Sequence, residues 1–196
     1  MVTKYGFSGV REQLVDGIKG AYPTRLEGLK TGMVLGEDIF GSPQLHPNAV
    51  LNLFTEQRVK FALPFAAYRA ALGGFSSLIS DKPGTVLPRL TLASTFYGME
   101  VIRGGLAQLA HSVVCNMNLE WCHDTACAVR RTEGLNKIYD AMVKERKADV
   151  LFTPTLKNIV CANCAKTAEA AYQFWWEMTW EKLPRIFGVG TTWEEV

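Results

Sequence analysis

Four cysteines in the second half of the chain have the spacing of a metal site. Cys122 and Cys127 form a C-x4-C pair, and Cys161 and Cys164 form a C-x2-C pair that runs into a predicted helix. Two thiolates on a short loop reach one ion, and two such pairs complete the tetrahedral sulfur shell of zinc. A helix start also favours thiolates through its dipole. The sequence therefore predicts one structural zinc ion held by these four residues.

Other interpretations of these cysteines stay open. Cysteine is among the most buried residue types, so the thiols can equally be packed in a core. Cys161 and Cys164 can instead serve a thiol-dependent enzyme or redox protein, although the strand–helix alternation that usually accompanies such a motif is missing. His123, inside the first pair, can replace one sulfur or support a ligand by a hydrogen bond.

Other catalytic patterns are missing from the sequence. Gly73-Gly74 follows a predicted helix and lacks the downstream Lys-Ser/Thr of a phosphate loop. No G-x-S-x-G elbow and no paired metal-binding histidines occur. His46 is interpreted as a loop residue, and His111, on an apolar stripe, as a core histidine. We therefore expect no catalytic residues, no cofactor besides zinc, and a protein that is not an enzyme.

Helical periodicity is the dominant pattern along the chain. Residues 89–118 carry apolar side chains at steps of three and four, which predicts one long helix, or two broken at Gly104-Gly105. The stripe consists of Leu92, Phe96, Met99, Ile102, Leu106, Leu109 and Val113. A second amphipathic helix is expected to begin at Thr132, and a last helix to run from about Cys164 to Trp180. Asn48 is the expected cap of an earlier helix.

Strand signals are scarce, so the predicted fold is all-α. We expect an irregular multi-helix bundle with a long central helix, a C-terminal helix and little or no sheet. No clear linker divides the chain. The expected organisation is a single helical domain over residues 1–189 and a flexible tail over residues 190–196.

The C-terminal helix is rich in aromatic residues. Trp175, Trp176 and Trp180 cannot all lie on one helix face. One interpretation is a core anchor combined with an exposed contact for a protein partner. The other is complete burial in a small terminal core.

Composition excludes several classes of protein. The 196 residues are 48% hydrophobic and 20% charged, with a net charge of +2 and no basic stripe for nucleic acid. No long uncharged apolar stretch is present, so no membrane span is expected. Five cysteines without an export signal indicate reduced thiols and a cytoplasmic or nuclear location.

Several motifs resemble those of fungal BTB/POZ domain-containing proteins. They lie in the helical region that follows the BTB core of that family. The matching stretches are Thr3-Lys4-Tyr5-Gly6-Phe7 with Val10-Arg11, Ala21-Tyr22-Pro23-Thr24, Phe61 to Tyr68, Cys161-x2-Cys164, Phe174-Trp175-Trp176, and Trp180 to Gly188. The resemblance covers nearly the whole chain, and its last motif is the most specific.

The resemblance implies a protein–protein interaction module. Family members are taken as interaction proteins, some of them adaptors of cullin-type ubiquitin ligases, and the BTB core itself would precede residue 1. The leading hypothesis is therefore a non-enzymatic interaction module with a structural zinc site. The alternatives are the thiol-dependent enzyme above and a truncated structural protein without a partner of its own. The sequence identifies neither the partner nor the oligomeric state.

Overall fold

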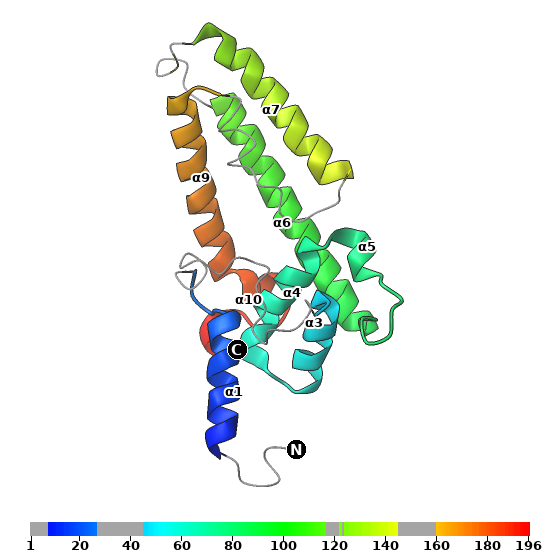
Figure 1. The fold of residues 1–196 in the computed structure, drawn as a ribbon. Coiled ribbons are helices and arrows are strands. Elements are labelled where there is room, and N and C mark those ends of the chain that lie inside the picture. Colours follow the sequence, from blue (N-terminus) through cyan, green and yellow to red (C-terminus); the bar gives the residue numbers. More distant parts are fainter. Residues whose placement is uncertain (1–7, 27–44, 117–121, 123, 145–159) are drawn as a thin grey trace.

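The protein is built from helices (Figure 1). The computed structural model describes residues 8–26, 45–116, 122, 124–144 and 160–196. Within these ranges there are eight α-helices, two 3-10 turns and no strand. The helices are α1 (Ser8–Ala21), α3 (Pro47–Glu56), α4 (Leu63–Leu72), α5 (Gly74–Leu78), α6 (Arg89–Asn116), α7 (Thr125–Lys144), α9 (Ala162–Glu181) and α10 (Leu183–Ile186). The turns are η2 (Lys60–Ala62) and η4 (Trp193–Glu195). The prediction of an all-α fold is confirmed for the described residues.

Helix α6 is the long axis of the molecule (Figure 1). It runs 28 residues without a break at Gly104-Gly105. Its buried stripe contains Met99, Ile102, Leu106, Ala110 and Val113, at the steps of three and four that place residues on one helix face. The predicted long central helix is therefore a single helix.

One histidine on α6 differs from its prediction. His111 is exposed, so its interpretation as a core residue is wrong. It directly follows the buried Ala110, and one residue is about 100° around a helix, which turns it away from the stripe. Its apolar neighbours in the sequence therefore did not indicate on which face of the helix His111 lies.

The larger core surrounds α4, which packs against α3, α6 and α10. Alanines on α4 let the neighbouring helices approach closely, while Phe65 and Tyr68 fill the remaining space. Trp180 of α9 closes this core, with its ring centroid 5.5 Å from that of Phe65. Its indole Nε1 donates to the Thr24 carbonyl at 3.3 Å, which satisfies the buried donor.

Asn48 has a different role from the predicted helix cap. His46 caps α3, and its Nδ1 accepts a hydrogen bond from the Asn48 amide at 3.3 Å. Asn48 itself lies inside the helix and is fully buried. Its Nδ2 donates to the carbonyls of Ser77 at 2.9 Å and Thr85 at 3.1 Å. The side chain thus fixes the connection between α5 and α6, a long-range contact that local sequence does not reveal.

A smaller core joins the C-terminal half of α6 to the beginnings of α7 and α9. It contains Leu106, Ala110, Val113, Cys127, Val160, Cys164 and Ala168. Trp175 packs against both cores. Each of α7 and α9 packs along α6, whereas their contacts with each other are few. The two helices are therefore held together mainly at their N-terminal ends.

The predicted start of α7 needs correction. The helix begins at Thr125, so Thr132 lies in its interior, with its hydroxyl donating to the Ala128 carbonyl at 3.4 Å. Inside a helix a threonine hydroxyl commonly bonds the carbonyl one turn back, so a hydroxyl residue before an apolar run does not by itself mark the start of a helix. Farther along this helix, the side chains of the expected apolar face lie outside the described part of the structure. They are Leu135, Ile138, Tyr139, Met142 and Val143.

The end of the chain packs against α9. Trp193 of η4 stacks on Trp180 at 5.5 Å, and its Nε1 donates to the Trp180 carbonyl at 2.9 Å. These contacts fall within residues 190–196, which the sequence analysis separates as a flexible tail. The boundary between the domain and that tail stays a prediction, but Trp193 has a defined place.

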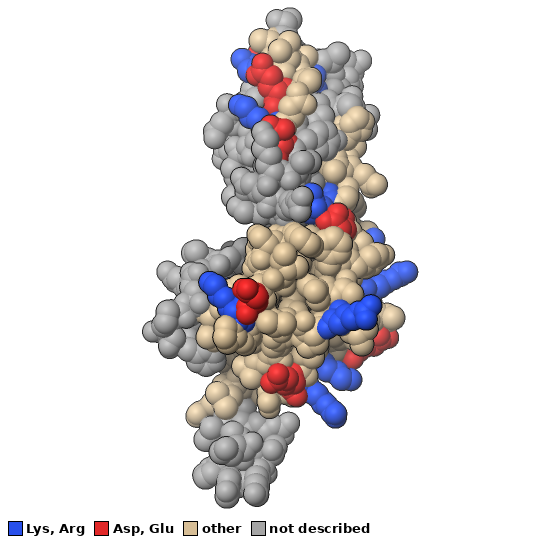
Figure 2. Space-filling model, turned by 90° about the vertical axis from the view of Figure 1, so that its right-hand side faces the viewer, with Lys and Arg blue, Asp and Glu red and all other residues tan. Residues whose placement is uncertain are grey.

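The surface carries both signs of charge. On the face turned toward the viewer in Figure 2, lysine and arginine alternate with aspartate and glutamate around a broad uncharged area. Within the described ranges, no helix is both long and apolar enough to span a bilayer.

Candidate metal centre

The four predicted cysteines come together where three helix ends meet. The C-terminal end of α6 lies beside the N-terminal ends of α7 and α9 at the top of Figure 1. Cys122 lies just before α7 and Cys127 lies in its first turn, whereas Cys161 caps α9 and Cys164 lies in its first turn. Each pair therefore has one sulfur before a helix and one on it. This arrangement turns both pairs toward one point.

The sulfur positions fit a single metal ion. All four Sγ atoms lie within 4.8 Å of one another, and those of Cys122 and Cys161 are 3.8 Å apart. A tetrahedral zinc ion with sulfur bonds of about 2.3 Å requires sulfurs about 3.8 Å apart. A disulfide requires about 2.05 Å, and the four are free thiols. The arrangement is that of a metal-binding cluster rather than a cross-link.

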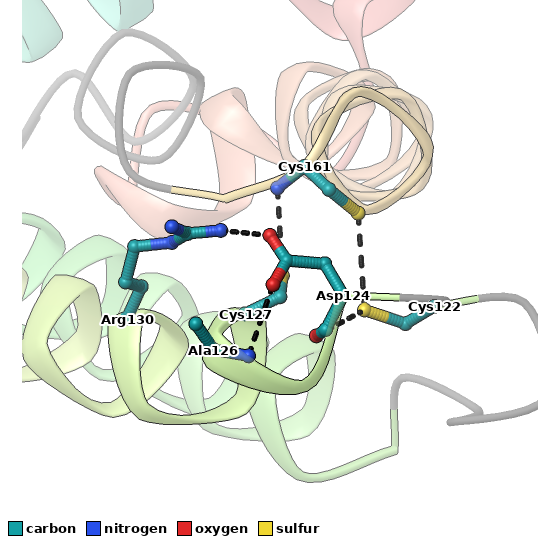
Figure 3. A network of polar contacts seen from close by, with 6 residues as sticks. All are labelled: Cys122, Asp124, Ala126, Cys127, Arg130 and Cys161. Carbon is teal, nitrogen blue, oxygen red and sulfur yellow. Dashed lines mark hydrogen bonds and ion pairs between the residues drawn. The ribbon is translucent and has the colours of Figure 1, made fainter.

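Backbone groups support the cluster. The Cys161 amide donates to the Sγ of Cys127 at 3.4 Å (Figure 3), which ties the α9 cap directly to α7. The Cys122 thiol points to the Asp124 carbonyl at 3.5 Å. Amide donors delocalise the negative charge of a thiolate shell, and such outer contacts tune metal sites. Backbone groups thus contact the sulfurs of the site in addition to the contacts among the sulfurs themselves.

Asp124 shapes the loop between the first two cysteines. Its carboxylate accepts from the Ala126 amide at 2.9 Å and pairs with Arg130 (Figure 3). Its carbonyl accepts from the Cys127 amide at 3.0 Å. Asp124 is therefore the N-cap of α7. The side chains of the ion pair are about 40% exposed, so their attraction contributes at most about 1 kcal/mol.

The thiols have unequal acidities. The nearby Cys164 amide lowers the pKa of Cys161 to about 7, because it favours the thiolate at the start of α9. Burial raises the pKa of both Cys127 and Cys164. A metal cation supplies the charge that buried thiolates otherwise lack.

The four cysteines differ in burial. Cys127 and Cys164 are buried in the smaller core, whereas Cys122 and Cys161 are half-buried. Apolar surroundings on one side exclude water from the ligands, and the half-buried pair leaves a route to solvent.

Sequence reasoning found the four cysteines but missed their supporting residue. The structure brings together Cys122, Cys127, Cys161 and Cys164. His123, the predicted substitute ligand, lies outside the described residues. Asp124 was missed, although an aspartate two residues before an amide donor at a helix start is a recognisable cap signal. The helix was expected to begin too late for that signal to be used.

Comparisons with known proteins add no relative. The chain matches no protein-family model, no curated protein and no solved structure. Its resemblance to the fungal BTB/POZ proteins rests on the motifs alone and stays a prediction.

Proposed function

We propose that this chain is a non-enzymatic protein-interaction module with one structural zinc ion. The ion holds together the smaller lobe, which consists of the C-terminal half of α6 and the first parts of α7 and α9 around the smaller core. The observation that supports the zinc site is the convergence of four thiols from two distant chain segments. Cys122 and Cys161, 39 positions apart, have sulfurs 3.8 Å from each other. Four ligands fill a zinc coordination shell and leave no open position for a substrate.

The placement of the ion supports a structural role. Helices α7 and α9 pack on α6 but have few contacts with each other. An ion bound between their starts converts binding free energy into folding free energy, because the unfolded chain has no preformed site. It acts as the missing contact between the two helices.

The interaction role is the extension of this proposal. It accords with the motif resemblance and with the large apolar side chains left exposed on α9, Phe174 and Met178. Participation in a ubiquitin-ligase adaptor is the finer form of the same hypothesis and follows from the resemblance alone.

Metal analysis tests the zinc site. Protein purified without added metal should carry one zinc per chain, and chelation should lower its Tm. Cys164→Ser should abolish the bound zinc, since it removes a buried ligand. Cys115→Ser is the matched control, because Cys115 is the one cysteine of the chain that belongs to neither the C-x4-C nor the C-x2-C pair. Much less than one equivalent of zinc, together with a Tm unchanged by chelation, would refute the structural role.

Thiol reactivity distinguishes a structural zinc site from the alternative, a thiol-dependent enzyme or redox protein. A structural zinc shell protects its four thiols from alkylation until the metal is removed. A redox pair at Cys161 and Cys164 would instead react readily in the protein as purified and would cycle between dithiol and disulfide. Rapid alkylation of both residues in metal-containing protein would favour that alternative.

A further inference from the structure

An open groove lies along the second half of α9, away from the start of that helix, where the cysteines lie. It has a volume of about 750 Å³, within the range of roughly 300–1,000 Å³ typical of ligand clefts. Three segments line it: the chain after α1, the face of α9 and η4. The described lining residues are Thr24, Arg25, Leu26, Phe174, Glu177, Met178, Glu181, Trp193 and Glu194.

Two large apolar side chains of the lining, Phe174 and Met178, are exposed, and they are called the floor of the groove here. Phe174 is 66% exposed and Met178 is 45% exposed. They are four residues apart, which places them side by side on one face of α9. The opposite face of the same helix already contributes Trp180 to the larger core. Helix α9 is therefore apolar on two sides, and only one of them is covered by described residues.

The rim of the groove is acidic. Among the described lining residues, the charged ones, called the rim here, are Glu177, Glu181 and Glu194 against the guanidinium of Arg25. The whole chain has a net charge of +2, so this excess of carboxylates is a local feature. A complementary ligand would bring positive charge to the rim and apolar groups to the floor.

The geometry points to a basic amphipathic helix of a partner protein as the occupant of this groove. A helix-in-groove partner places apolar side chains at i, i+3, i+4 and i+7 into such a floor and keeps lysine or arginine at the edges. The unbranched, polarisable side chain of Met178 adapts to different apolar anchors. Addition of an extended peptide to a sheet edge is the main alternative mode of recognition, and the described residues form no sheet.

This inference rests on the proposed interaction role and names the chemistry of the partner. The cysteine cluster lies at the other end of α9 from the groove. Cys161 caps the start of that helix, whereas the groove begins at Phe174. Zinc and groove can thus be tested separately.

Photo-crosslinking in the full-length chain identifies the occupant. Phe174 is replaced by p-benzoylphenylalanine, and the probe is a fluorescent helical peptide of leucine and lysine, about four turns long. A peptide with glutamate in place of lysine is the matched control. We expect a crosslink to the lysine peptide and at least tenfold weaker binding of the glutamate peptide. Crosslinks into the same chain, or into a second copy despite excess peptide, would overturn the inference.

Charge reversal tests the rim. The double substitution Glu181→Lys and Glu194→Lys should weaken binding of the lysine peptide at least tenfold, with Tm unchanged. Glu133→Lys and Tyr97→Ser change exposed residues outside the groove, and they should leave affinity within twofold. Equal binding by both peptides, or no effect of charge reversal, would contradict the inference.

The outcomes distinguish the groove from the general role. Capture of a specific protein that is insensitive to Phe174→Ser and to rim reversal would keep the interaction module and remove this groove. Peptide binding by protein that carries no zinc as purified and whose Tm is unchanged by chelation would keep the groove and remove the structural metal.

Discussion

Individual side chains at the cysteine cluster have opposed electrostatic environments. Cys161 lies at the start of α9, where backbone amides favour its thiolate, whereas burial disfavours the thiolates of Cys127 and Cys164. A full set of four thiolates is therefore unstable without a cation. This is the physical reason for expecting metal binding and deprotonation to be coupled.

Zinc affinity should consequently rise with pH. The metal-free cluster holds the protons of Cys127 and Cys164 at neutral pH, and below its pKa of about 7 Cys161 holds one as well. Zinc displaces these protons, so acid expels the ion and alkali favours it. With two or more protons released, the apparent affinity should rise at least about 100-fold from pH 6 to pH 7. Competition with a chromogenic chelator at each pH measures this, and an affinity independent of pH would contradict it.

At the scale of elements, small residues decide how closely the helices pack. Helix α6 passes the C-terminal segment at Gly98, where a Cβ would lie 2.3 Å from Cε1 of Phe187. Phe187 is itself buried in the larger core. Six residues along the same helix, Gly104 faces open space. Close packing therefore excludes a side chain at Gly98, whereas no atom of the structure excludes one at Gly104.

Alanine at these two glycines should have opposite effects on stability. Gly98→Ala forces Phe187 out of place and should lower the free energy of unfolding by about 1–3 kcal/mol. Gly104→Ala meets no atom within 4 Å and should raise it by up to about 1 kcal/mol, because alanine favours the helix. Urea denaturation of both variants provides the comparison. Equal effects would show that α6 and the Phe187 segment do not pack as described.

At the scale of the whole molecule, the two cores differ in their side chains. The larger core contains Phe65, Tyr68 and Trp180, whereas the smaller one consists mostly of aliphatic and small residues and the cysteines. Larger aromatic side chains bury more apolar area. The smaller lobe therefore depends more on any additional link between its helices, and the cysteine cluster is at that position.

Removal of zinc should loosen one lobe and spare the other. After chelation, amide hydrogen exchange should speed up in α7 and in the first half of α9, because these segments lose their common anchor. Exchange in α4 should stay slow, because its packing does not involve the cluster. Mass spectrometry of peptides from metal-loaded and chelated protein measures both regions. Unchanged exchange in α7, or uniform acceleration including α4, would contradict this division.

The sequence by itself determined the helical architecture and the four cysteines. Steps of three and four predicted α6 and most of its buried stripe, since periodicity is a local property of the helix. Phe96, which was assigned to that stripe, is exposed, and the buried Ala110 was not assigned to it. Paired spacing identified Cys122, Cys127, Cys161 and Cys164 for a similar reason, because short loops limit where their sulfurs can lie.

Tertiary structure alone decided which distant groups meet. Nothing near Asn48 indicates that its amide fixes residues 77 and 85, nor does the spacing of glycines distinguish Gly98 from Gly104. The acidic groove likewise combines the segment after α1, the face of α9 and the last turn. Local sequence specifies a helix face, but the partner of that face depends on how the whole chain packs.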